Sequence, residues 1–581
     1  MSLSSPDRSW GPSHQHGALR ARRRWKAKAV AIALLFLELL GHRLLQPGGG
    51  GALASTLHTM VRDGLLVAVL FFLARAILTG RVRLSFSRAR RAPTTRLSER
   101  LLDAENPGDE IRAHTRQLGG GAFLGFSHGG RWVTADPEHA VMVLGPPRSG
   151  KTSSVVIPSL LAAPGAALST STKLDVMQAT HRARAELGQV WLFDPSGEQA
   201  VWPTGVRRLC WSPVSGAGTW DGALLMARAM ASSSSAARGT SHEHHWSERS
   251  AALLAPLLHA ANLSNKPIAE VLHWVLRADL DPAGKALEAH EVKIASDVLI
   301  GIARTDARER SSIFSATAGV LAAYNADTTR KAAANPNFDA ERFVASSDTV
   351  YITAPAHKQA LCAPLVVGLL EQIRHATYAH ARERPCTPPV FFCLDEIANI
   401  APIHDLPALV SEAGGQHLHI LACLQDLSQA RSRWGADAAD GFLSLFQTKL
   451  VLSGIADSRT LEAISLVLGE YDRRLVSHTI SRSAPNEYLA TSTDSESVTS
   501  HTQRHRTLTP GDIARLPPGH GLLLHGAHWG LLRLTPWYRT QPWTAVAGLE
   551  KSVRIGPTSP SVRSIDTSVD SMKSATPHPH A

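Results

Sequence analysis

A glycine-rich stretch in the first third of the chain has the spacing of a phosphate-binding loop. It reads Gly145, Pro146, Pro147, Arg148, Ser149, Gly150, Lys151 and Thr152, which fits G-x-x-x-x-G-K-[ST]. In such a loop the backbone N–H groups surround phosphates at a helix N-terminus, the lysine reaches the β- and γ-phosphates, and the hydroxyl ligates Mg²⁺. A glycine-rich turn with a surface lysine is the alternative. The apolar run Val141–Leu144 supplies the strand that must precede the loop, so we predict an ATP site in which Lys151 is catalytic.

A second apolar run, Val390–Leu394, ends in two acidic residues that complete this site. Asp395 and Glu396 follow it directly. A P-loop needs a carboxylate to hold the water shell of the metal and a base to polarise the attacking water. Apolar runs that end in Asp-Glu are common, and the pattern is informative because a P-loop accompanies it. We predict that Asp395 and Thr152 bind Mg²⁺, Asp395 through water, and that Glu396 polarises the attacking water.

Short apolar runs, separated by turns and helical stretches, continue from about residue 140. They are Val141–Leu144, Gly165–Leu168, Val190–Phe193, Thr349–Ile352, Val390–Leu394, Leu418–Leu424 and Lys449–Ser453. Strands that alternate with helices predict a largely parallel sheet and therefore an α/β fold. The run Leu418–Leu424 ends at Gln425, which is either a sensor of the γ-phosphate or a plain polar residue at a strand end.

The remaining stretches suggest a division into domains. Residues 220–345 are Ala-rich and helical in pattern, which predicts an all-α insertion between two parts of a P-loop domain, 140–219 and 346–550. Residues 81–139 are expected to be a connector. The Ser/Thr-rich stretch Ser477–Thr509 is expected to be a mobile loop, and the polar tail 551–581 to be disordered.

Two apolar stretches near the N-terminus, 29–45 and 64–78, are candidate membrane spans within a region of 28–80. Each is near the lower length limit for a spanning helix, and each contains a charged residue. A signal peptide, a single span and a surface segment are the alternatives. Lys and Arg flank the pair on both sides, at 20–28 and 81–91, whereas the link between them is poor in charge. The positive-inside rule then predicts two membrane spans joined by a short external loop, with the basic residues 1–27 and the bulk of the chain in the cytoplasm.

The net charge of +11 does not indicate a general nucleic-acid-binding surface. Residues 1–100 hold 17 Lys/Arg and 4 Asp/Glu, a net of +13, so the rest of the chain is at −2. The five cysteines lack metal-ligand spacing and are expected to be reduced structural thiols. His242, His244 and His245 are close in sequence, but no further Cys or spaced His pair completes a metal site, so a solvated loop is expected.

The motifs now resemble, in order and number, those of the TraG/TraD-like type IV coupling proteins. Besides the P-loop, the matching segments are Val155–Pro158, Ser169–Asp175, Phe193–Pro195, Trp211–Pro213, His245–Trp246, Asp348–Tyr351, Asp395–Ile400, Gln425–Gln429, Leu508–Pro510 and Leu516–Gly519. The resemblance covers about residues 140–538.

The resemblance implies a RecA-like P-loop core that assembles as a homo-hexamer below the inner membrane. It implies an all-α domain that selects substrate, and a role in which ATP hydrolysis moves DNA with its relaxase, or protein effectors, to a type IV secretion channel. An FtsK/HerA-like DNA translocase is the alternative among motors, and a catalytically silent substrate receptor is the alternative outside them. The long helical insertion favours a coupling protein over the first, and the complete set of site residues argues against the second.

One segment departs from the family pattern. Many relatives place an arginine that acts on the neighbouring subunit between the Asp-Glu pair and the next strand, where this chain has Ser411–His417 without an arginine. Arg431, Arg433 and Arg459 are the candidates to replace it. Surface charges and a slowly hydrolysing enzyme are the alternative interpretation.

Overall fold

The computed structural model describes residues 106–199, 202–234, 243–384, 388–482 and 494–548. The predicted membrane spans at 29–45 and 64–78 and the predicted disordered tail at 551–581 lie outside these residues. Within the described ranges, no helix has both the length and the apolarity needed to cross a membrane.

A mixed sheet of 12 strands forms the centre of the protein, in the order β2-β1-β14-β13-β10-β3-β9-β8-β4-β7-β5-β6. Eight neighbouring strands run parallel: β10 (Thr448–Leu452), β3 (Val141–Leu144), β9 (Leu418–Leu424), β8 (Val390–Leu394), β4 (Ala167–Ser171), β7 (Thr349–Thr353), β5 (Val190–Phe193) and β6 (Val206–Arg208). Four antiparallel strands extend one side: β13 (His520–His525), β14 (His528–Arg533), β1 (Phe123–Phe126) and β2 (Trp132–Thr134).

The predicted parallel strands are confirmed, and four of them match to the residue. β7 and β10 differ from their predicted bounds by one residue, whereas β4, predicted at Gly165–Leu168, lies at Ala167–Ser171. Its last three residues are polar but buried, so the apolar run misplaces the strand. The sequence also predicts no strand within 81–139, whereas β1 and β2 of that segment belong to the sheet.

Helices cover both faces of the sheet, because successive strand residues point to opposite faces and both sets are apolar. Along β3, Met142 and Leu144 pack into one core, whereas Val141 and Val143 pack into the other. The second core is covered by α4 (Pro107–Gln117), α5 (Ile157–Ala162), α6 (Asp175–Ala185) and α22 (Trp543–Val546). The first is covered by α15 (Gln359–Glu383), α16 (Ile397–Ile400), α17 (Leu406–Ala413), α18 (Leu427–Trp434), α19 (Ala436–Leu445), α20 (Ser458–Leu468) and α21 (Pro510–Ala514).

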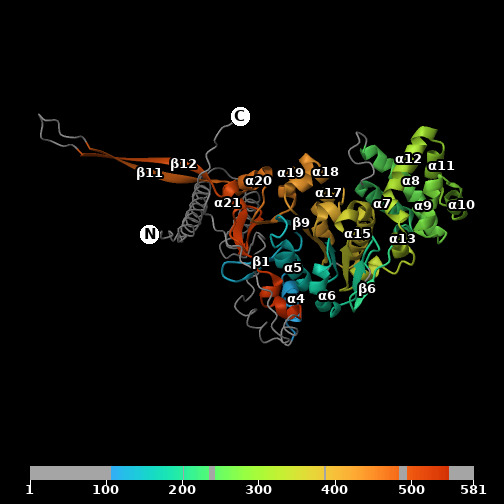
Figure 1. Cartoon of the computed structure of the whole chain (residues 1–581), viewed down its shortest axis with the longest axis horizontal. Coiled ribbons are helices and arrows are strands. Elements are labelled where there is room, and N and C mark those ends of the chain that lie inside the picture. Colours follow the sequence, from blue (N-terminus) through green and yellow to red (C-terminus); the bar gives the residue numbers. More distant parts are fainter. Residues whose placement is uncertain (1–105, 200–201, 235–242, 385–387, 483–493, 549–581) are drawn as a thin grey trace, which may run out of the picture. The chain divides into compact units, whose positions relative to one another are not determined.

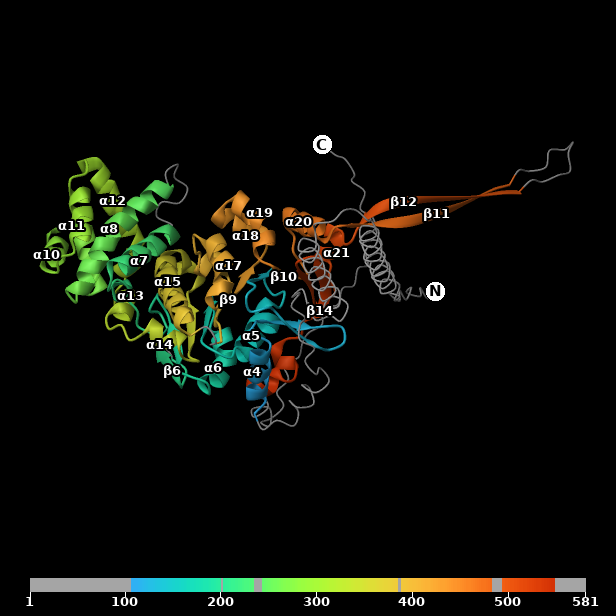
Figure 2. The same cartoon turned by 180° about the vertical axis from the view of Figure 1, so that it is seen from behind.

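Between β6 and β7 every described regular element is helical. These elements are α7 (Trp220–Ser233), α8 (Glu243–Leu263), α9 (Ile268–Arg277), α10 (Asp281–Ala289), α11 (Lys293–Ala303), α12 (Ala307–Val320), α13 (Asp327–Ala333) and α14 (Ala340–Val344), with short 3₁₀ turns. Figure 2 shows them gathered beyond the β6 side of the sheet, next to α15. Apolar residues of α7 and α8 share the first core with the sheet, so the helical region packs on the rest without a break in the core.

The expectation of a mobile loop at Ser477–Thr509 is wrong for its described part. Two antiparallel strands, β11 (Glu470–Arg482) and β12 (Asp494–Arg506), form a separate two-stranded ribbon that runs out from the end of α20 (Figure 1). The Ser/Thr content alone predicts a loop here. Thr, Val and Ile are β-branched, and all three occur in these strands, a composition that suits extended backbone.

A buried histidine in β9 fastens the segment before the P-loop to the sheet. The Ala122 N–H donates to His419 Nε2 at 3.0 Å, and Nδ1 of the same ring lies 3.1 Å from the Pro137 carbonyl oxygen. Burial lowers the pKa of His419 to about 4, so the ring is neutral and donates from Nδ1. Residues 122–137 are thereby held beside the strand that separates the two halves of the nucleotide site.

Candidate nucleotide site

The P-loop follows β3 and turns sharply before the helix that it caps. The Gly145 N–H still pairs with the Leu424 carbonyl oxygen of β9 at 3.2 Å, and the chain then leaves the sheet. A Cβ at position 145 would lie 2.6 Å from Ser149 Oγ and 2.9 Å from Leu452 Cβ, so only glycine fits. Gly150 has a φ of +98°, which disfavours any side chain. The glycines of the motif are therefore required by packing and by backbone conformation.

The helix after the loop opens with a π-helical turn at Thr152–Val156, before α5. The Ile157 N–H donates to the Thr152 carbonyl oxygen, five residues earlier. Pro158 explains this widening, since it has no N–H and its ring would clash with the carbonyl group four residues before it in a regular α-helix. The proline that marks this segment of the sequence thus shapes the turn that carries Thr152.

Lys151 lies folded back over the loop. Its Nζ donates to the carbonyl oxygens of Gly145 and of Pro146, the latter at 3.1 Å, and the residue is only 8% exposed. Ser149 Oγ, in the same loop, is buried without a hydrogen-bond partner among the described residues. Among the described residues, the hydrogen bonds of this buried ammonium group go only to carbonyl oxygens, which, next to an unsatisfied hydroxyl group, fits the binding of an anion.

The two predicted metal ligands meet across the sheet. Thr152 Oγ1 donates to Asp395 Oδ2 at 2.9 Å, although 243 residues separate them in sequence. Burial raises the pKa of Asp395, while the Thr152 hydrogen bond and the Lys151 charge oppose that rise. A carboxylate beside a hydroxyl group supplies oxygen ligands, which suit a hard cation such as Mg²⁺.

Glu396 occupies a backbone conformation that its residue type disfavours. Its φ of 56° and ψ of 42° place it in the left-handed region, directly after Asp395 and before α16. The Asn399 side-chain amide donates to Glu396 Oε2 at 3.0 Å, which orients the carboxylate. Strained residues of this kind cluster at functional sites, where the surrounding structure holds them in place.

Gln425 lies at the junction of the two halves of the site. Its strand, β9, pairs with β3 on one side and with β8 on the other. Leu424 is level with Leu144 at the end of β3, whereas β8 ends two residues lower, where Leu394 is level with Ala422. Gln425 therefore follows its strand beside the start of the P-loop, and its N–H donates to Gln429 Oε1 at 2.9 Å.

Sequence reasoning did not identify Thr170 as a member of the site. Thr170 Oγ1, at the end of β4, donates to the backbone carbonyl oxygen of Asp395 at 2.8 Å and fixes the turn between the two acids. The run Ser169–Thr170–Ser171 is the signal that could have identified it, because buried hydroxyl groups at the end of a strand need hydrogen-bond partners.

The three candidate arginines differ in what holds them. Arg431 forms a 2.6 Å ion pair with Asp457 and is mostly buried. Arg433 donates to the carbonyl oxygens of Pro402 at 3.1 Å and Ser233 at 3.4 Å. Arg459, in the first turn of α20, is exposed. Of the three, Arg459 is the one whose side chain faces solvent within the described structure.

Most of the described thiols are buried, and His244 and His245 lie at the start of α8 rather than in the expected solvated loop, while His242 lies outside the described residues. Cys362, Cys393 and Cys423 are free and buried, and burial raises the pKa of each thiol. His244 is exposed and lies 3.6 Å from Glu248. In the part of the chain that the structure describes, no three His, Cys, Asp or Glu side chains form a group suited to a metal ion.

A sequence profile for type IV secretory system conjugative DNA transfer matches residues 97–553. The chain belongs to this family. The match takes in the P-loop, the Asp395–Glu396 pair, the helical region and the ribbon. Among curated protein sequences, none matches the chain.

Solved structures of a conjugative coupling protein, TrwB, have the same fold. The unbound form of TrwBdeltaN70 is 16% identical, with a TM-score of 0.52, and the match covers 74% of this chain and 91% of that one. TrwB in complex with ADP and Mg²⁺ is 16% identical, and TrwB with the ATP analogue ADPNP is 17% identical; for both the TM-score is 0.53 and the coverage is 74% and 92%. This likeness shows that the protein has a TrwB-like α/β fold with a large, mostly parallel sheet.

Proposed function

We propose that this type IV family member is a membrane-anchored ATPase with a RecA-like core, which brings DNA with its relaxase, or protein effectors, to a type IV secretion channel and drives transfer by ATP hydrolysis. The observation that carries the proposal is the meeting of Thr152 with buried Asp395 beside Lys151. The family match supports the conjugative role, and the TrwB complexes with ADP, Mg²⁺ and ADPNP support nucleotide binding.

The residues divide the work of hydrolysis among them. The backbone N–H groups of the P-loop and Lys151 would hold the phosphates, and Thr152 and Asp395 would hold Mg²⁺, which offsets phosphate charge when it is bound. Glu396 accepts the proton of the attacking water, with Asn399 fixing the carboxylate. Gln425, beside the start of the P-loop, is placed to contact the γ-phosphate.

The test of the proposal joins hydrolysis to transfer. A chain that begins at residue 97 should release phosphate from ATP only when Mg²⁺ is present, and the intact gene should restore DNA transfer to a donor cell that lacks it. Hydrolysis without any role in transfer would contradict the coupling function. Transfer that needs the chain but no ATP hydrolysis would favour the silent receptor.

The helical region between β6 and β7 is proposed to select the cargo. It holds none of the site residues and adjoins the core through α7 and α15. Within the proposed homo-hexamer, one subunit's arginine would complete the site of the next.

Arg459 is the arginine that we expect to act on the neighbouring subunit. Arg459→Ala should bind ATP and assemble normally but lose most of its turnover, because the charge that leaves with the γ-phosphate is no longer neutralised. Mixing it with Lys151→Ala subunits should restore part of the phosphate release, since one partner supplies an intact site and the other an arginine. Mixing it with the Arg459→Ala, Lys151→Ala double variant is the matched control. Full activity of Arg459→Ala alone would refute the assignment.

The apolar stretches at 29–45 and 64–78 are proposed to anchor the chain in the inner membrane with both of their outer flanks in the cytoplasm. The support is the concentration of Lys and Arg on those flanks. Reporter fusions at the N-terminus and after Arg91 should both give cytoplasmic signals. An external signal from either fusion would rule out the two-span arrangement.

A further inference from the structure

Among the described strands none pairs with the outer edges of the β11–β12 ribbon, and three apolar side chains are exposed on one of its faces. Each strand has 13 residues, so the ribbon is about 43 Å long at about 3.3 Å per residue. Val476, Ile480 and Val498 are 52%, 63% and 57% exposed. The alternation of side chains and the register, which pairs His478 with Val498, place these three on one face.

The middle of this ribbon lacks the features that keep edge strands from pairing. Isolated two-stranded ribbons are marginally stable in water, and free edges are usually blocked by proline, by charges in the strand or by a covering element. Neither strand contains proline, and the stretches 475–479 and 497–501 contain no Lys, Arg, Asp or Glu. The ribbon is therefore suited to receive a further strand along each side.

The charges at its base indicate which strand would fit. In the antiparallel register Glu470 faces Arg506, and Asp472 faces Arg504, with 3.8 Å between the Asp472 and Arg504 groups. The acidic members lie on β11 and the basic members on β12. A second copy that placed its β12 against the free edge of β11 would bring its Arg504 beside Asp472 in the same register.

We propose that the ribbon of each subunit pairs with those of its neighbours, β11 of one copy beside β12 of the next. This contact is head-to-tail, so it uses both free edges of every ribbon and closes when the subunits form a ring. A strand from a different protein would satisfy one edge and leave the other open. The inference rests on the ring of the proposed function, to which it adds the contact surface.

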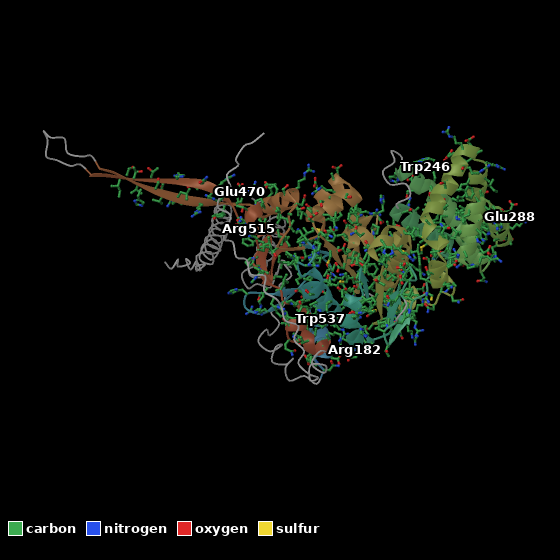
Figure 3. The ribbon with its side chains drawn as sticks, viewed as in Figure 1. Arg182, Trp246, Glu288, Glu470, Arg515 and Trp537 are labelled. Carbon is green, nitrogen blue, oxygen red and sulfur yellow. The ribbon has the colours of Figure 1, made fainter. Side chains whose placement is uncertain are left out.

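The base of the ribbon is fixed to the ATPase core. Arg506 donates from both terminal nitrogens to Glu462 of α20, at 2.6 and 2.8 Å. Glu470 marks the start of the ribbon in Figure 3. Because Arg459 lies in the same helix as Glu462, pairing of the ribbons would also restrain the helix that carries the proposed trans-acting arginine.

Single cysteines test the pairing in the full-length chain. Ser477 and Thr499 face each other in the register, so Ser477→Cys on one set of chains and Thr499→Cys on another, both with Cys210→Ser and Cys386→Ser, can meet only between copies. A short bismaleimide should link the mixture and neither variant alone. A link formed by Ser477→Cys alone would mean that β11 pairs with β11, which overturns the head-to-tail arrangement. No link in a mixture that assembles and hydrolyses ATP would overturn the inference while leaving the proposed function intact.

A charge placed on the apolar face gives an independent test. Val476→Lys with Ile480→Lys should cut the yield of the link at least tenfold, because both residues lie diagonal to Val498 of the pairing β12 and lysine would replace these apolar contacts with charges in the middle of an edge strand. Val476→Thr with Ile480→Thr is the matched control and should keep the link, since threonine retains the β-branch. An unchanged link in the lysine variant, accompanied by stronger binding to single-stranded DNA or to anionic vesicles, would show that the face binds those partners and would overturn self-pairing.

Discussion

Replacing Lys151 with alanine is expected to lower ATP hydrolysis by at least about 100-fold, the scale on which one charged or hydrogen-bonding contact to a transition state acts. The ammonium group of Lys151 is buried in the P-loop, where it donates to the carbonyl oxygens of Gly145 and Pro146. It is therefore close to where the phosphates would bind. Phosphate release by the purified chain, measured with saturating Mg²⁺, is the readout.

Lys266→Ala is the matched control for this result. Lys266 is an exposed lysine of the helical region, far in sequence from the site, so its loss should leave hydrolysis unchanged. The substitution leaves two backbone carbonyl groups of the loop without the Lys151 donor, which could also lower the stability of the fold. The melting temperature of Lys151→Ala should therefore be compared with that of the parent chain. A folded Lys151→Ala chain that still hydrolyses ATP at the parent rate would remove this residue from the mechanism.

Glu396→Gln is expected to bind ATP with nearly unchanged affinity and to turn over about 10² to 10⁴ times more slowly, which is the usual contribution of a general base. Glutamine keeps the shape of the side chain and an oxygen for the Asn399 amide, but it cannot accept a proton. Binding should be followed with a fluorescent nucleotide and turnover by phosphate release. Glu288→Gln, on the helical region in Figure 3, is the control and should be silent.

Two other outcomes for Glu396→Gln would be informative. Normal turnover would show that another group polarises the water. Loss of nucleotide binding would show that this carboxylate helps to hold the nucleotide or its metal ion. In the second case the roles of Asp395 and Glu396 would have to be reassigned.

The predictions from sequence were most accurate where burial alone decides the structure. Strands β3, β5, β8 and β9 were predicted to the residue, because a parallel strand covered on both faces appears as an unbroken apolar run. The P-loop and the Asp-Glu pair follow two of these strands. Their meeting at Thr152 and Asp395 could therefore be expected from the motif alone.

What the sequence did not reveal depends on partners that are distant in the chain. The ion pair of Arg431 joins it to Asp457, and the hydroxyl group of Thr170 finds its carbonyl partner 225 residues away. Neither contact leaves a local pattern. The ribbon was missed for a different reason: its strands are solvated on both faces, so they lack the apolar runs by which the buried strands were recognised.

The left-handed backbone conformation of Glu396 lowers the stability of the fold, whereas its side chain is needed for ATP hydrolysis. A residue with a Cβ pays about 1–2 kcal/mol for this conformation, and glycine would avoid that cost while giving back part of the gain through its greater freedom in the unfolded chain. Selection for thermal stability alone would thus favour glycine at this position, although that substitution removes the carboxylate that hydrolysis needs. A thermostable relative that has lost its carboxylate here would fold well but would hydrolyse ATP slowly.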